Sequence, residues 1–128
     1  MTARRYRLRG DRGTATVEVT IYTPVLLALV PLGVQVAVWG MAWLGADYTA
    51  SHAAQTTRVY GGTVADGQAA AAGILDSAVG QRLYDPQVSI TRSATTVTVT
   101  VRGTAASLIP GWAPPVTATV VVPVERLN

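Results

Sequence analysis

The chain has 128 residues, the usual length of one domain, and no cysteine, which excludes disulfides and cysteine-ligated metal clusters. Hydrophobic residues make up 49% of the sequence and charged residues only 13%, about half the share typical of a soluble domain. The net charge of +3 is weak evidence for nucleic-acid binding, because the unbalanced basic residues all precede one long apolar run.

Residues 1–13 form a basic leader with five arginines and one aspartate. The five arginines and five acidic residues that follow the apolar run balance each other. Positive charge flanking a membrane span favours the cytoplasmic side. The sequence therefore predicts a cytoplasmic N-terminus and an extracytoplasmic domain over residues 47–128.

The apolar run from Val19 to Ala46 has 28 residues without a charge. As a helix it would span about 42 Å, whereas a bilayer core of about 30 Å needs about 20 residues. Pro24 and Pro31 are tolerated in membrane helices. We predict a single transmembrane helix over residues 14–46, since the remaining residues are too few to bury it as a soluble core. A cleaved signal peptide is an alternative, but its apolar region would be about 7–15 residues.

Glu18 is the only charged residue between Arg12 and Asp47. Placing a carboxylate in hydrocarbon is energetically costly, and the helix macrodipole stabilises a carboxylate near the helix N-terminus by only about 0.3–1 kcal/mol. The α-amino group of a neighbouring subunit could pair with Glu18 and so fix the register of an assembly. Alternatively, Glu18 caps the helix at the level of the lipid headgroups.

Gly13 followed by Thr14-Ala15-Thr16-Val17-Glu18 resembles the prepilin signal of the type IV pilin superfamily. The resemblance implies that a membrane aspartyl peptidase cuts after Gly13. Thr14 would then be the first mature residue and Glu18 the fifth.

Three stretches together resemble the TadE-like family of the tight-adherence (Flp-type) pilus system: RGTATVEVTIYTPVLLALVPLGVQ, YTASHAAQTTRVYGG and VTATVVVPVER. Val19 departs from the aromatic residue that many members carry after the glutamate. Flp major pilins stop soon after the helix, so the additional domain favours a minor pilin. The implied partners are other pilins, the prepilin peptidase and inner-membrane assembly proteins.

Small residues recur at every fourth position where the apolar run ends. They are Ala42, Ala46, Ala50 and Ala54, with Gly33 and Ala37 as an earlier pair. Such ridges allow close helix packing in membranes, although alanine is also simply common here. The alanine ridge is also the obvious cover for the valine face of the sheet predicted below.

The next segments predict a second helix. Gly61-Gly62 ends the first helix, and Thr63 with Asp66 resembles a capping box. We predict the second helix over residues 64–83. Its apolar face would comprise Ile74, Leu75, Ala78, Val79 and Leu83.

The last third of the chain predicts three strands. A β region opens at Asp85-Pro86, residues 96–101 alternate strictly between threonine and valine, and residues 116–124 form a third strand. Ser93-Ala94 is a plausible hairpin turn, and Pro123 suggests an edge strand. Trp112, in the loop before the last strand, would be a contact point or a core plug, and we favour the plug.

These elements predict an α+β, pilin-like fold. A single N-terminal transmembrane helix continues into an extracytoplasmic helix, followed by a second helix and a small three-stranded antiparallel sheet. No catalytic motif occurs, and His52, the sole histidine, lies on a predicted helix. We therefore expect no enzyme, cofactor, metal, small-molecule substrate or nucleic-acid partner.

The sequence thus favours a minor pilin or pseudopilin that takes part in assembly or anchoring of a tight-adherence pilus. One alternative is an uncleaved single-pass envelope protein with a non-catalytic interaction domain. Another is a soluble module released by a signal peptidase near Asp47.

Overall fold

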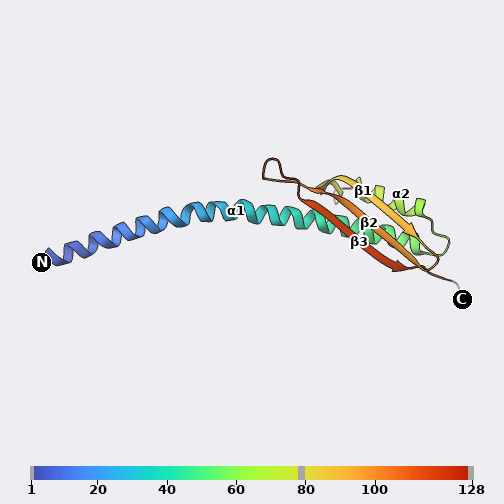
Figure 1. The fold of residues 1–128 in the computed structure, drawn as a ribbon, viewed down its shortest axis with the longest axis horizontal. Helices are drawn as coiled ribbons and strands as arrows, with labels where there is room; N and C mark the ends of the chain where they lie inside the picture. The colour runs from blue at the N-terminus through green and yellow to red at the C-terminus, as the bar shows by residue number, and fades with distance from the viewer. Residues whose placement is uncertain (1, 78–79, 127–128) are drawn as a thin grey trace. The chain divides into compact units, whose positions relative to one another are not determined.

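The computed structural model describes the backbone of residues 2–77 and 80–126 and the side chains of residues 14–77 and 81–126. The chain divides into two compact units, Met1–Val34 and Gln35–Asn128, and helix α1 (Thr2–Arg58) runs through both (Figure 1). The second unit also contains α2 (Val64–Leu75), a short 3-10 helix η1 (Gly80–Arg82) and the strands β1 (Leu83–Arg92), β2 (Thr96–Ala105) and β3 (Pro115–Pro123). The predicted α+β fold class is confirmed.

Helix α1 ends where the sequence places two glycines. Gly61 has φ +78°, in the left-handed region that favours glycine. The Gly62 N–H donates to the Val59 carbonyl at 2.9 Å. A Cβ on Gly62 would lie 2.7 Å from the carbonyl oxygens of Thr56 and Thr57, so the close turn requires glycine there. The predicted helix end is confirmed.

Helix α2 begins with the predicted capping box. The Asp66 N–H donates to Thr63 Oγ1 at 3.1 Å, and the Thr63 N–H donates to the Asp66 carboxylate at 3.0 Å. These two bonds satisfy amides that the first turn of a helix leaves without partners.

The predicted end of the second helix was wrong, because α2 stops at Leu75 rather than at residue 83. The Ser77 N–H and hydroxyl both donate to the Ile74 carbonyl, which closes the last turn locally. Leu83 instead opens β1 and pairs with Ala105. Ile74 and Leu75 are half-buried. Ala78 and Val79, also assigned to the apolar face, lie outside the described residues.

The three strands form an antiparallel sheet in the order β1-β2-β3. Strand β1 continues across Asp85-Pro86 because the ladder accommodates an irregularity between Tyr84 and Gln87, where Asp85 adopts φ 48°. The predicted turn is confirmed: the Ser93 N–H donates to the Thr96 carbonyl at 2.8 Å. The predicted edge position is also confirmed, since β3 and its Pro123 lie at the margin of the sheet.

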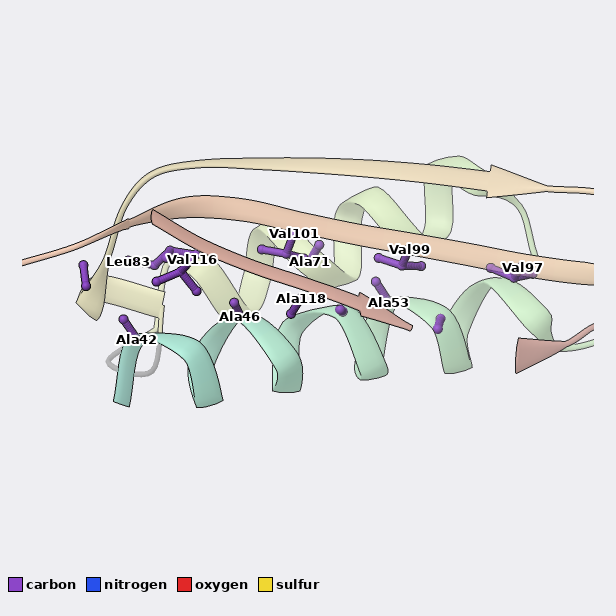
Figure 2. Packing of buried hydrophobic residues seen from close by; sticks show 13 residues of the cluster. Ala42, Ala46, Ala53, Ala71, Leu83, Val97, Val99, Val101, Val116 and Ala118 are labelled. Carbon is purple, nitrogen blue, oxygen red and sulfur yellow. The ribbon is translucent and has the colours of Figure 1, made fainter. Parts of the chain in front are cut away.

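The core lies between the valine face of β2 and the helices (Figure 2). Val97, Val99 and Val101 are fully buried. They belong to one cluster with the alanines of α1, Ala71 of α2 and Val116 and Ala118 of β3. The prediction that the alanine ridge covers the valine face is confirmed.

Trp112 does not plug this core. Its side chain is 47% exposed, whereas the neighbouring Pro114 is fully buried. Small alanines bring α1 close to the sheet, so the space between them is filled by valine side chains without an indole. The prediction of a core plug was therefore wrong.

Candidate functional site

The segment of α1 from Thr14 to Val34 exposes its apolar side chains. The residues of this segment whose large hydrophobic side chains are exposed are Val17, Val19, Ile21, Tyr22, Val25, Leu26, Leu27, Leu29, Val30, Leu32 and Val34. Thr14–Arg58 is the one helix among the described residues that is long and apolar enough to cross a membrane. An apolar surface of this extent on one helix requires lipid or other helices to cover it.

The residues of the predicted processing site lie on consecutive turns of α1. The backbone is helical at Gly13, Thr14 and Glu18. The Thr14 and Glu18 side chains are exposed. Among the side chains that the structure describes, none forms an ion pair with the Glu18 carboxylate.

The two sets of small residues have different surroundings. Gly33 and Ala37 are exposed, and no heavy atom lies within 4 Å of a Cβ built on Gly33. Ala42, Ala46, Ala50 and Ala54 are 0% exposed and lie against the sheet of the same chain. The close approach that the alanine ridge permits is thus to the sheet, and only the earlier pair presents a free surface. Packing of Gly33 and Ala37 against another helix stays a prediction.

Gln35 is a structural residue that the sequence analysis missed. It is only 3% exposed and clamps the loop between β2 and β3. Its Nε2 donates to the Ala106 carbonyl at 3.0 Å, and its Oε1 accepts from the Leu108 N–H at 2.7 Å. One turn further along α1, Trp39 Nε1 donates to the Pro115 carbonyl at 3.1 Å. The sequence did contain one indication of this role, because Gln35 is the only residue with a carboxamide side chain between Val19 and Ala46.

An open groove of about 590 Å³ runs along α1 beside η1. It is lined by Met41, Leu44, Gly45, Asp47, Tyr48, Ser51 and Arg82. The Arg82 guanidinium donates to Met41 Sδ at 2.9 Å. The walls are mostly apolar and carry one charge of each sign.

His52, the only histidine, is exposed on α1 and stacks on Tyr48 with ring centroids 6.3 Å apart. Asp66 belongs to the α2 capping box, and Asp76 is the C-cap of the same helix. In the described part of the chain, His52 therefore lies on the surface, and the two aspartates cap the ends of α2. That the protein is not an enzyme stays a prediction.

A long apolar N-terminal helix followed by a small antiparallel sheet that packs on it is a pilin-like architecture. The fold and the exposed apolar helix therefore assign the protein to the class of pilin-like architectures. No protein-family model matches the chain, and neither a curated protein nor a solved structure is significantly similar to it.

Proposed function

We propose that this protein is a minor pilin or pseudopilin of a tight-adherence, Flp-type pilus, with a role in its assembly or anchoring. The observation that carries the proposal is the exposed apolar surface of α1 between Thr14 and Val34. This segment starts immediately after Gly13 in the sequence and contains Glu18 near its N-terminal end. The basic leader supports a cytoplasmic N-terminus and an extracytoplasmic sheet.

In this proposal, cleavage after Gly13 creates a free α-amino group on Thr14. Glu18 of one subunit then pairs with that amine on a neighbouring subunit within the membrane. Removing one partner of a buried ion pair costs about 3–5 kcal/mol, so the pair favours a single register between helices. The partners are other pilins, the prepilin peptidase and the inner-membrane assembly proteins. No catalysis by this chain is involved.

The position of the sheet supports this proposal over release near Asp47. A cut there would remove Gln35, Ala42 and Ala46 from the unit to which they belong. The sheet would lose the clamp on its loop and part of the alanine cover of its valines.

The N-terminus of the chain extracted from membranes of its native host tests the proposal. We expect Edman sequencing and intact mass to show a start at Thr14. An intact arginine-rich leader would contradict processing and favour a permanently anchored envelope protein. A start near Asp47 would instead indicate a secreted module.

We predict that Glu18→Gln leaves membrane insertion unchanged and lowers co-purification with partner pilins by about tenfold or more, because a neutral amide cannot pair with the α-amine. The measurement is quantitative mass spectrometry of cross-linked, detergent-extracted complexes. Insertion is checked by resistance to alkaline extraction.

Glu18→Asp is the matched control, because it keeps the charge on a shorter side chain. We expect it to retain more partner association than Glu18→Gln. Equal association of the native chain and Glu18→Gln would remove the pairing role from the proposal.

A further inference from the structure

The loop between β2 and β3, residues 106–114, presents three large apolar side chains to its surroundings. Leu108 is 55% exposed, Ile109 50% and Trp112 47%. No charged residue occurs between Arg102 and Glu125, so the loop and both flanking segments are uncharged. An exposed apolar cluster on an uncharged loop marks a contact surface.

The loop holds these side chains outward by its own hydrogen bonds. The Ile109 N–H donates to Ser107 Oγ at 3.0 Å, and the Trp112 N–H donates to the Ile109 carbonyl at 3.3 Å. Gly111 adopts φ +78°, and the buried Pro114 anchors the end of the loop. The exposure of Leu108, Ile109 and Trp112 is therefore a property of an ordered turn.

The loop is attached to α1 at the residue where that helix first becomes buried. Gln35 binds Ala106 and Leu108 through both ends of its amide, and Trp39 binds Pro115. Gln35 directly follows Val34, the last residue of the stretch 14–34 in which every residue is exposed; beyond it, exposed apolar side chains such as Val36 and Leu44 alternate with buried residues. Figure 1 shows the loop at the opposite end of the sheet from the β1–β2 hairpin.

The sheet limits how far the bilayer can reach along α1. The open edge of a sheet cannot lie in hydrocarbon, because its unpaired N–H and C=O groups would have no partners there. Since the sheet packs on α1 from about Gln35 onward, the hydrocarbon around an inserted α1 would end close to that residue, which is earlier than the end at residue 46 expected from the sequence. The 21 residues from Thr14 to Val34 span about 31 Å as a helix, which matches a bilayer core of about 30 Å.

We propose that the 106–114 loop enters the lipid interface beside α1, with Leu108, Ile109 and Trp112 as its anchors. Tryptophan is enriched at this depth, and Trp39 exposes part of its ring one turn beyond Gln35. Lipid fits the surface because the loop is uncharged and its attachment to Gln35 places it at the end of the span. The loop would fix the depth and tilt of the domain against the membrane. This inference rests on membrane insertion of α1, as the proposed function does, but not on cleavage or on pairing of Glu18.

The test uses the absence of native cysteine. Ala113→Cys in the loop and Ala94→Cys in the β1–β2 hairpin each receive an environment-sensitive nitrobenzoxadiazole label. Both labelled full-length chains are reconstituted in vesicles of equal parts phosphatidylcholine and phosphatidylglycerol, with or without headgroup- and acyl-nitroxide lipids. We expect the loop label to emit at shorter wavelength and to be quenched by lipid nitroxides at least about threefold more than the hairpin label, because quenching requires the label at membrane depth.

Replacing Leu108, Ile109 and Trp112 together by serine in the Ala113→Cys chain should abolish this difference. Hydrogen exchange of β2 verifies that the sheet remains folded in that variant. For the unmodified chain, a photoactivatable phospholipid should form adducts within residues 106–114 and not within 93–96.

Three outcomes would overturn the inference. The first is equal quenching of the two labels in a chain that resists alkaline extraction. The second is a shift of the loop label to shorter wavelength only when other pilins are present, and the third is the absence of lipid adducts in the loop. The second would identify a protein contact. None of the three affects processing after Gly13, whereas failure of α1 to insert would remove the proposed function as well.

Discussion

Replacing Ala50 by leucine is expected to lower the free energy of unfolding of the helix–sheet unit by about 3 kcal/mol, near the upper end for inserting methylenes into a packed core. Ala50 is 0% exposed in α1 and shares one core cluster with Val99 and Val101. A leucine needs space that only separation of the sheet from α1 can provide. Small domains have about 5–15 kcal/mol of stability in total, so this loss is large.

The measurement is amide hydrogen exchange of β2 in the detergent-solubilised full-length chain, because the sheet reports on this unit separately from the apolar helix. Ala37→Leu is the matched control, since Ala37 is exposed on the same helix. We expect Ala37→Leu to change stability by no more than about 0.5 kcal/mol. Unchanged β2 protection in Ala50→Leu would contradict the packing of the sheet on the alanine ridge.

Gly67→Ala is the second substitution with a large expected effect. We expect it to lower the free energy of unfolding, although helix propensity alone would raise it. Alanine in place of glycine inside a helix normally stabilises by about 0.5–1 kcal/mol. Gly67 is buried where α2 meets α1, however, and a Cβ there would lie 2.0 Å from Thr57 Oγ1 and 2.8 Å from Ile90 Cδ1. Thr57 is fully buried and donates to the Ala53 carbonyl at 2.8 Å, so its hydroxyl cannot move without losing that bond. We expect a net destabilisation of about 1–3 kcal/mol.

Gly73→Ala provides the matched control in the same helix. Nothing lies within 4 Å of a Cβ at Gly73, so we expect this variant to be more stable than the native chain by about 0.5 kcal/mol. Thr57→Ala combined with Gly67→Ala should cost at least about 1 kcal/mol less than the sum of the single changes, because it removes the clashing hydroxyl. Thermal unfolding followed by circular dichroism in detergent measures all four variants. Stabilisation by Gly67→Ala would show that α2 does not approach α1 as described.

Part of the candidate site could be read from the sequence. The spacing from Gly13 to Glu18 and the uncharged run behind it are properties of consecutive residues, so no tertiary information was needed to find them. The structure adds that α1 is helical through this region and that Glu18 is exposed. Gln35 was overlooked because its hydrogen-bond partners, Ala106 and Leu108, lie 71 and 73 residues further along the chain.

The sequence by itself determined the elements that local chemistry specifies. Alternation of valine and threonine defines β2, the side chain of Ser93 closes the hairpin, the Thr63–Asp66 box starts α2, and Gly61-Gly62 ends α1. At the hairpin turn and the two helix ends the decisive groups are neighbours in the chain, so the same hydrogen bonds and backbone preferences operate whatever surrounds them. For β2 the alternation alone indicates a strand, although its hydrogen bonds run to β1 and β3.

Only the tertiary structure decided which surfaces are covered. It buries the alanine ridge under the sheet of the same chain, ends α2 at Leu75, leaves Trp112 exposed and joins its loop to Gln35. Burial depends on contacts between residues distant in sequence, and periodicity can say that a face is apolar but not what packs against it. For this protein, that difference separates the alanines that pack under the sheet from the apolar side chains of residues 14–34, which stay exposed.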